Sequence, residues 1–158
     1  MRSRLASLRT AELGIPGVLR DRLVAAVLSG AKTATTSLLV EWELDHEPMP
    51  YPGEHFAVVD SHAVAVAVVE IVHVRVIALA DVDHTTAAAK GEGFASVGQW
   101  RQAHEAFWGS YRDDLRARLA DPSWTLTDDT PVVVEHFRLL ELVRPRREPS
   151  PGADTVVT

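Results

Sequence analysis

The residues from Gly30 to Ser37 place a single lysine, Lys32, just before a run of hydroxyl side chains. A lysine ammonium stabilises a developing anion, or accepts a proton if its pKa is lowered enough. A neighbouring hydroxyl supplies a nucleophile or a hydrogen bond. The segment therefore holds groups suited to hydrolysis of an amide or a phosphodiester. The same groups also suit binding of a polar ligand without chemistry.

The elements around Lys32 must hold it in a turn. Apolar residues recur at helical spacing from Leu19 to Leu28, and Gly30 is the residue best able to leave a helix in a left-handed conformation. The β-branched and apolar residues from Thr33 to Trp42 predict a strand. We therefore expect an exposed Lys32 between a helix and a strand. Residues 43–53, which are acidic and contain three prolines, should form a loop.

The pattern of apolar and polar residues predicts the remaining strands and helices. Strands are expected at His55–Asp60, at Ala63–Leu79, which should be central and buried, and at Pro131–Val143. A short helix is expected over Asp81–Ala89 with Asp81 near its N-cap. Ser96 should cap a helix whose apolar stripe runs without a break from Trp100 to Leu119.

These elements predict an α+β fold with one core. Mixed, mostly antiparallel strands would form a small barrel or curved sheet flanked by helices. Residues 17–143 should make up this domain, preceded by an N-terminal arm or helix over residues 1–16. Residues 144–158 lose all periodicity and are expected to form a disordered tail.

Composition narrows the classes of function. The chain has 158 residues and no cysteine, which excludes disulfides, thiolate zinc sites and cysteine nucleophiles. No apolar run approaches the roughly 20 residues needed to span a bilayer, so we expect a cytoplasmic protein without a membrane partner. The net charge of -6 argues against non-specific binding along a nucleic-acid backbone. A basic N-terminal region beside the acidic residues 41–60 would still accept a small anionic ligand.

Several segments in this order resemble an ASCH domain over roughly Leu19–Val143. They are Gly30-Ala31-Lys32-Thr33-Ala34-Thr35, Glu41-Trp42-Glu43, Met49-Pro50-Tyr51-Pro52-Gly53-Glu54, Val58-Val59-Asp60, Val82-Asp83, Gly91-Glu92-Gly93, Trp100-Arg101 with His104, and Val133-Val134-Glu135-His136-Phe137. The resemblance implies a small β-barrel similar to the PUA domain, with a cleft that in relatives binds RNA or a modified nucleoside. Some longer relatives act as ribonucleases. Short bacterial relatives hydrolyse N4-acetylcytidine with a lysine and a threonine of a G-x-K-x-x-T turn and a glutamate.

On this resemblance Lys32 and Thr35 fall on the lysine and threonine, and Glu92 is the candidate for the glutamate. The loop of similar sequences often reads E-G-E-G-D, whereas this chain has Lys90-Gly91-Glu92-Gly93-Phe94 and lacks two of the carboxylates. We therefore predict Lys32, Thr35 and Glu92 as the catalytic residues. Either Lys32 loses its proton and serves as the base, or it stays protonated and Glu92 acts as acid and base.

The resemblance leaves three functions open for an RNA- or nucleotide-binding protein. A ribonuclease is placed ahead because the length and the segment from Trp100 to His104 resemble the longer relatives. An N4-acetylcytidine-type amidohydrolase and a non-catalytic RNA-binding or nucleotide-sensing module are the alternatives. The ribonuclease would accommodate a divalent metal, and the amidohydrolase would need no cofactor. The acidic residues 43–47 match no closed metal site, so no metal ligand is assigned.

Five further residues are predicted to bind the substrate. Hydroxyls would hold phosphate oxygens, a tryptophan would stack on a base, and basic side chains would contact the ligand. The predicted residues are Thr36, Ser37, Trp42, Arg101 and His104. His104 has a competing interpretation as a core histidine, because it lies on the apolar stripe.

Overall fold

Five strands form one curled sheet in the order β1-β3-β4-β5-β2 in the computed structural model, which describes residues 2–143. The strands are β1 (Arg9–Ala11), β2 (Ala34–Leu38), β3 (His55–Val59), β4 (Ala65–Ala78) and β5 (Pro131–Leu142). β1 pairs with β3 in parallel, and the other three pairings are antiparallel. The sheet curls into a half-barrel of the expected PUA-like kind. Its two edge strands are β1 and β2, and the gap between these edges is called the seam below.

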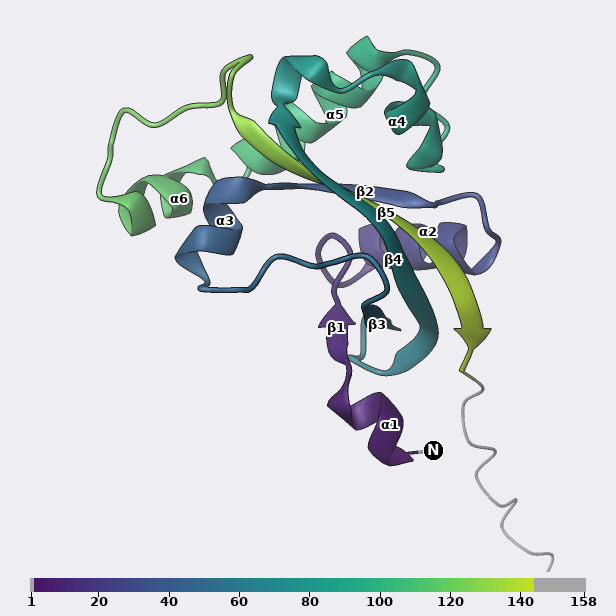
Figure 1. Ribbon diagram of the computed structural model, residues 1–158. Helices are drawn as coiled ribbons and strands as arrows, with labels where there is room; N and C mark the ends of the chain where they lie inside the picture. The colour runs from purple at the N-terminus through teal and green to yellow at the C-terminus, as the bar shows by residue number, and fades with distance from the viewer. Residues whose placement is uncertain (1, 144–158) are drawn as a thin grey trace, which may run out of the picture.

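Helices surround this sheet (Figure 1). They are α1 (Arg2–Ser7), α2 (Val18–Leu28), α3 (Leu39–Leu44), α4 (His84–Ala89), α5 (Val97–Gly109) and α6 (Arg112–Leu119), with a 3-10 turn at Leu79–Asp81. α4 and α5 lie together at one end of the long β4–β5 pair, and α3 and α6 lie side by side at the seam. No helix in the described part of the chain is long and apolar enough to cross a membrane.

Two groups of buried side chains form the core. One joins α2 to the sheet and includes Val27, Phe56 and Phe137. The other joins α5 and α6 to the far ends of β2 and β5 and includes Trp100 and Trp108. Since β4 and β5 are long enough to cross both groups, they hold the two halves of the domain together.

The predicted strand over 33–42 is wrong in its second half, because β2 ends at Leu38 and α3 follows. The strand that pairs with β2, which is β5, explains why β2 ends at Leu38. Leu38 lies opposite Val132, one residue after β5 begins at Pro131, which has no backbone N–H to extend the ladder. α3 begins directly at Leu39, and Trp42 on this helix faces the seam.

Two helix boundaries also differ from expectation. α4 is capped by Asp83 rather than Asp81, and its carboxylate accepts a hydrogen bond from Thr86 N at 2.8 Å. The single stripe predicted from Trp100 to Leu119 is divided between α5 and α6, with a break at Ser110–Tyr111.

Other expectations are confirmed. β3, β4 and β5 lie where the pattern of apolar and polar residues predicted strands. β4 is central in the sheet as expected, but it is not buried along its whole length, since Val72 and Val76 are exposed. Ser96 caps α5. Gly30 follows the C-cap of α2 and has the predicted left-handed conformation, with a φ of 82°. The N-terminal residues include the short helix α1 and also the edge strand β1. The tail expected over residues 144–158 lies outside the described residues.

Candidate functional site

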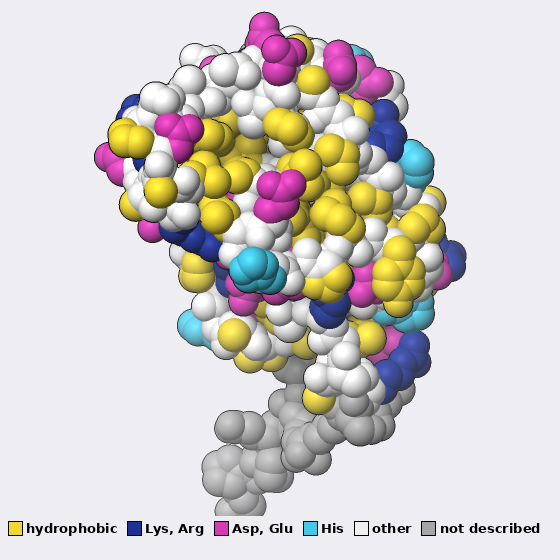
Figure 2. Space-filling model, turned by 60° about the vertical axis from the view of Figure 1, so that its left-hand side comes forward, with side chains coloured by type: hydrophobic (Ala, Val, Ile, Leu, Met, Phe, Trp, Pro, Cys, Tyr) yellow, Lys and Arg dark blue, Asp and Glu magenta, His cyan; other side chains and the backbone are white. Residues whose placement is uncertain are grey.

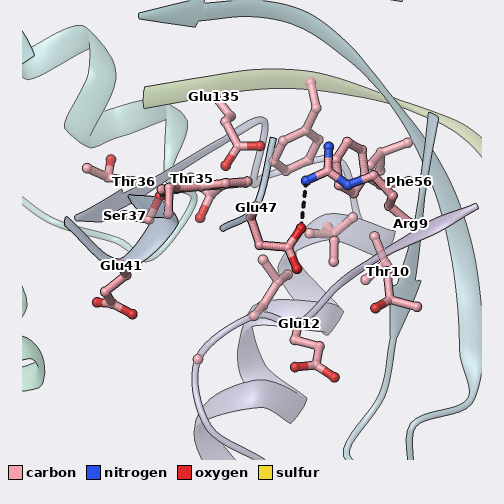
Figure 3. A pocket seen from close by; sticks show the side chains of 18 of the residues that line it. Arg9, Thr10, Glu12, Thr35, Thr36, Ser37, Glu41, Glu47, Phe56 and Glu135 are labelled. Carbon is pink, nitrogen blue, oxygen red and sulfur yellow. Dashed lines mark hydrogen bonds and ion pairs between the residues drawn. The ribbon is translucent and has the colours of Figure 1, made fainter. Parts of the chain in front are cut away.

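A pocket of about 840 Å³ occupies the seam, with residues of both edge strands in its wall. The rest of the wall comes mainly from β3, β4, β5, α2, α3, α5 and the chain around Tyr111. Figure 3 shows polar side chains that reach the pocket. Six aromatic residues line it: Trp42, Phe56, Phe107, Trp108, Tyr111 and Phe137. On the face of the molecule in Figure 2, hydrophobic side chains gather around acidic ones. The pocket thus has the aromatic walls that a flat ring needs.

Five carboxylates and one guanidinium line the same pocket. The carboxylates belong to Glu12, Glu41, Asp45, Glu47 and Glu135, and the guanidinium belongs to Arg9. Three of the carboxylates already have partners. Glu47 pairs with Arg9, Asp45 pairs with Arg118, and Glu41 accepts a hydrogen bond from the Tyr111 hydroxyl at 2.6 Å. Glu12 is exposed at the rim, which leaves Glu135 as the buried carboxylate without such a partner.

Glu135 lies in the middle of β5, directly opposite Thr35 of β2. Only 8% of it is exposed, and its carboxylate has no hydrogen bond to any residue in the described part of the chain. Figure 3 shows this carboxylate turned into the pocket. Burial raises its pKa to about 7, although nearby Lys90 and Arg9 favour the charged form. A carboxyl group with this pKa can accept and return a proton near neutral pH.

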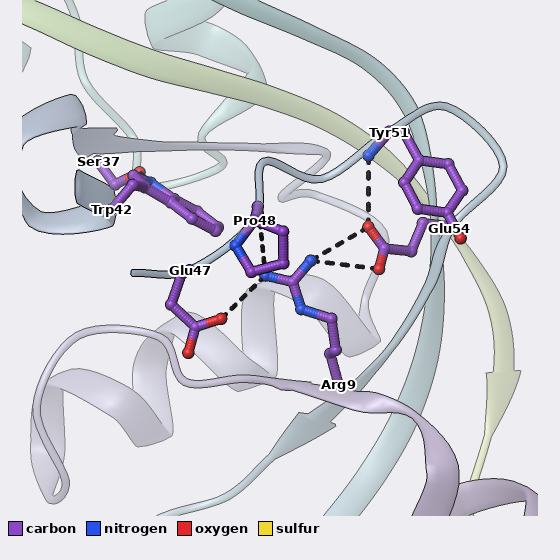
Figure 4. A network of polar contacts seen from close by, with 7 residues as sticks. All are labelled: Arg9, Ser37, Trp42, Glu47, Pro48, Tyr51 and Glu54. Carbon is purple, nitrogen blue, oxygen red and sulfur yellow. Dashed lines mark hydrogen bonds and ion pairs between the residues drawn. The ribbon is translucent and has the colours of Figure 1, made fainter. Parts of the chain in front are cut away.

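Arg9 fixes the opposite wall (Figure 4). Its Nη1 donates to Glu54 Oε2 at 3.2 Å, and its Nη2 donates to Glu47 Oε2 at 3.2 Å and to the Pro48 carbonyl at 2.8 Å. The guanidinium carbon also lies 4.9 Å from the centre of the Phe56 ring. These contacts tie β1 to the loop before β3. Because two carboxylates already neutralise Arg9, its charge is not free for a phosphate.

Lys32 is not exposed as predicted, since only 3% of it is accessible and it does not line the pocket. Its Nζ donates to the Ala34 carbonyl at 2.8 Å and to the Lys90 carbonyl at 3.4 Å. Burial lowers the pKa of Lys32 to about 8, while Glu92 and Glu135 oppose that change. Lys32 therefore joins the end of α4 to the start of β2.

The glycine loop explains this burial. Gly91 has a φ of +65°, and a Cβ added there would lie 2.5 Å from the Ala31 carbonyl and from the backbone nitrogen of Lys32. The loop thus packs directly on the turn and covers the lysine. It also brings Glu92 close enough to Lys32 to affect its pKa. Of the three predicted catalytic residues, only Thr35 lines the pocket.

The predicted binding residues divide into two groups. Thr36, Ser37 and Trp42 line the pocket together with Thr35. The Ser37 hydroxyl accepts a hydrogen bond from Trp42 Nε1 at 2.8 Å, which holds the indole against the pocket wall. Thr36 Oγ1 is buried and has no partner among the described residues.

Arg101 and His104 form the second group, and neither lines the pocket. Arg101 is paired on the surface with Glu105 and Asp128. The His104 ring stacks on Trp100 with 4.3 Å between ring centres, and its Nδ1 lies 2.9 Å from the Trp100 carbonyl. Burial lowers the pKa of His104 to about 3, so the ring is neutral at physiological pH. This is the geometry of a core histidine.

Three residues in or near the site were not predicted from the sequence: Glu135, Arg9 and Lys90. Lys90 is 2% exposed, and its Nζ lies 5.9 Å from the centre of the Trp100 ring. Glu135 carried a usable signal, because it interrupts the apolar run that begins at Pro131. Arg9 carried none, since its partners lie about 40 residues away in sequence. Within residues 2–143, no cluster of three or more histidine, aspartate or glutamate side chains is arranged to hold a metal ion.

Comparison with known proteins gives a consistent result. A family model described as an ASCH domain matches residues 13–141. The crystal structure of an ASCH domain from Lactobacillus crispatus JV V101 is similar, with a TM-score of 0.72 and 23% identity over 87% of this chain and 82% of that one. A protein from Enterococcus faecalis V583 is equally similar, with a TM-score of 0.72 and 22% identity over 85% and 77% of the two chains. No curated protein sequence matches significantly.

Proposed function

The chain belongs to the ASCH domain family, and we propose that its seam pocket binds a nucleoside unit and removes an acyl group from the exocyclic amine of the base. The observation that carries the proposal is Glu135, a buried carboxylate that faces an aromatic pocket and has no hydrogen-bond partner among the described residues. The RNA binding that the family resemblance implies would use the same pocket for one exposed base.

The shape of the pocket favours a base and its sugar. Aromatic rings such as Trp42 and Tyr111 offer faces on which a planar base can stack. The hydroxyls of Thr35 and Ser37 on β2 also line the pocket, where they can form hydrogen bonds to polar edges of the ligand. Because its volume is within the range of small-molecule pockets, one nucleoside would be largely enclosed.

The charge of the pocket favours acyl hydrolysis over RNA cleavage. Cleavage of a phosphodiester needs a cation at the phosphate, and Arg9, the guanidinium of the pocket, is already held by Glu47 and Glu54. The other charged groups of the wall are carboxylates, which repel a phosphate. Lys32 lies behind the wall, bonded to two backbone carbonyls. An uncharged amide on a base meets none of this repulsion.

Glu135 can carry out the proton transfers of amide hydrolysis. Its carboxylate would take a proton from a water molecule as the water oxygen bonds to the acyl carbon. The carbon–nitrogen bond would then break, and Glu135 would return the proton to the departing amine of the base. The products are the free nucleoside and a carboxylic acid. Thr35, directly across the strand pair, is placed to donate a hydrogen bond to the acyl oxygen.

The test is to incubate the protein with N4-acetylcytidine and, separately, with structured RNA with and without Mn²⁺. We expect release of cytidine and acetate, and loss of at least about 100-fold in rate on Glu135→Gln, which is typical for removal of an acid–base group. Glu141→Gln is the matched control, because Glu141 lies on the same strand outside the pocket.

Three outcomes would count against the proposal. RNA cleavage without nucleoside turnover would favour the ribonuclease. Binding of nucleosides without turnover of either substrate would favour the non-catalytic module. Full activity of the Glu135→Gln variant would remove Glu135 from the mechanism.

A further inference from the structure

We infer that the seam pocket prefers a base that carries delocalised positive charge, such as a ring-protonated or ring-alkylated cytosine, and that Glu135 is the counter-ion that selects it. This inference rests on the proposed function, because it takes the ligand to be a nucleoside. It goes further by assigning a charge to the base and a single residue to its recognition.

The first support is the imbalance of charge in the wall. Five carboxylates line the pocket against one guanidinium, which is bonded to Glu47 and also to Glu54, and Arg118 outside the wall neutralises Asp45. Glu12, Glu41 and Glu135 have no cationic partner in an ion pair among the described residues. A positively charged ligand would be attracted by this wall, and the attraction is strong in a partly buried site because water screens it less.

The second support is that Glu135 is the buried carboxylate left without a partner. Glu41, Asp45 and Glu47 each already accept a hydrogen bond from a neighbouring side chain. Glu135 is more than nine-tenths buried, faces the pocket and accepts none from the described residues. The carboxylate oxygens are open to the pocket rather than enclosed by protein, so a cationic ring in the pocket could pair with them.

The third support is the aromatic wall itself. A cation is attracted to the face of an aromatic ring, and the protein already uses this contact inside the pocket. The Arg9 guanidinium lies 4.9 Å from the centre of Phe56 and 5.9 Å from the centre of Trp42. A flat cationic base could stack on the remaining rings in the same way, which a neutral base would do less favourably.

The positive groups near Glu135 do not occupy the place of the ligand. Lys32 and Lys90 are buried outside the pocket wall, and Arg9 is paired with Glu47 and Glu54. Burial lowers the pKa of both lysines, most strongly for Lys90, which also feels the charge of Lys32. Their combined effect on the carboxylate is therefore smaller than two full charges would produce.

The experiment measures binding of three nucleosides by calorimetry at about pH 7.5, where the Glu135 carboxylate is mostly ionised. The probes are cytidine, 3-methylcytidine, whose ring is cationic, and 5-methylcytidine, which adds the same methyl group without charge. We expect 3-methylcytidine to bind the wild-type protein about tenfold more tightly than 5-methylcytidine. Glu135→Gln should remove most of that preference, and Glu141→Gln should retain it.

Equal affinity for the two methylated nucleosides would overturn the inference and leave the proposed nucleoside pocket standing. Failure of all three nucleosides to bind would overturn the proposed function as well. A preference for 3-methylcytidine that persists in Glu135→Gln would overturn the role given to that residue. Circular dichroism of each variant shows whether a loss of binding reflects a loss of fold.

Discussion

Replacement of Glu135 by glutamine should change how the stability of the protein depends on pH. The pKa of this carboxyl rises from its ordinary value of 4.5 to about 7 on folding, because burial disfavours the charged form. The native state therefore holds the proton more tightly than the unfolded state between these pH values. The resulting stabilisation is complete below about pH 4.5 and is lost as pH rises through about 7.

The size of the effect follows from the same values. At about 1.4 kcal/mol for each pH unit, the wild-type protein should lose about 3 kcal/mol of unfolding free energy between pH 4.5 and 8 through this group. Glu135→Gln cannot titrate and lacks this component. The difference in unfolding free energy between the variant and the wild type should thus grow by about 3 kcal/mol in favour of the variant as pH rises.

Urea denaturation followed by tryptophan fluorescence at several pH values between about 5 and 8 measures this difference. Comparison with the variant removes the contribution of titrating groups that lie far from Glu135, whereas Lys32 and Lys90, whose pKa values Glu135 raises, contribute to the difference. Glu141→Gln should follow the wild-type curve, since Glu141 lies on the same strand outside the pocket. If the difference between wild type and Glu135→Gln stays constant within about 0.5 kcal/mol, the burial argument for Glu135 fails.

Three other predictions test the surroundings of the pocket. Lys32→Ala should lower the unfolding free energy by about 2 kcal/mol or more, because the backbone carbonyls of Ala34 and Lys90 lose their donor. The control variant Arg22→Ala, on the exposed face of α2, should change the unfolding free energy by no more than about 0.5 kcal/mol. Equal losses of the two variants in urea denaturation would refute the role of the buried lysine. Gly91→Ala should lower the melting temperature more than Gly93→Ala, since both have positive φ but only Gly91 lacks room for a Cβ, and equal shifts would contradict the close packing of the loop. The His104 ring should show no protonation by NMR between pH 5 and 8, because burial lowers its pKa to about 3; titration near its ordinary 6.5 would contradict the stacked, buried geometry.

The sequence predicted those parts of the fold that depend on local pattern. β4 is rich in β-branched residues, and β5 has three consecutive valines directly after Pro131; such residues favour strands through their own conformational preference. Ser96 and Gly30 act within one turn of their helices, so their effects follow from neighbouring residues alone. The end of β2 at Leu38 was not predictable in this way, because it depends on where β5 begins almost a hundred residues later.

The candidate site was only partly predictable for the same reason. The hydroxyls of β2 and Trp42 were found because they lie close in sequence, and they do line the pocket. The exposure expected for Lys32 was wrong, because the loop at Gly91 covers the turn. No pattern in the residues around Lys32 predicts the contact with Gly91, which lies 59 positions later in the sequence. The wall formed by Arg9 likewise exists only because β1 pairs with β3.

Lys32 and Glu135 are both buried, but only Lys32 has hydrogen-bond partners among the described residues, and this difference indicates which of the two contacts a ligand. Two backbone carbonyls accept hydrogen bonds from Lys32, so its ammonium has partners within the protein. Glu135 accepts no hydrogen bond from the described residues, and its carboxylate opens onto the pocket, so a molecule in the pocket can bond to it there. A carboxyl group that faces a pocket and has a raised pKa is typical of residues that bind a ligand or transfer protons. We therefore propose that Lys32 holds β2 and the glycine loop in place and that Glu135 contacts the substrate.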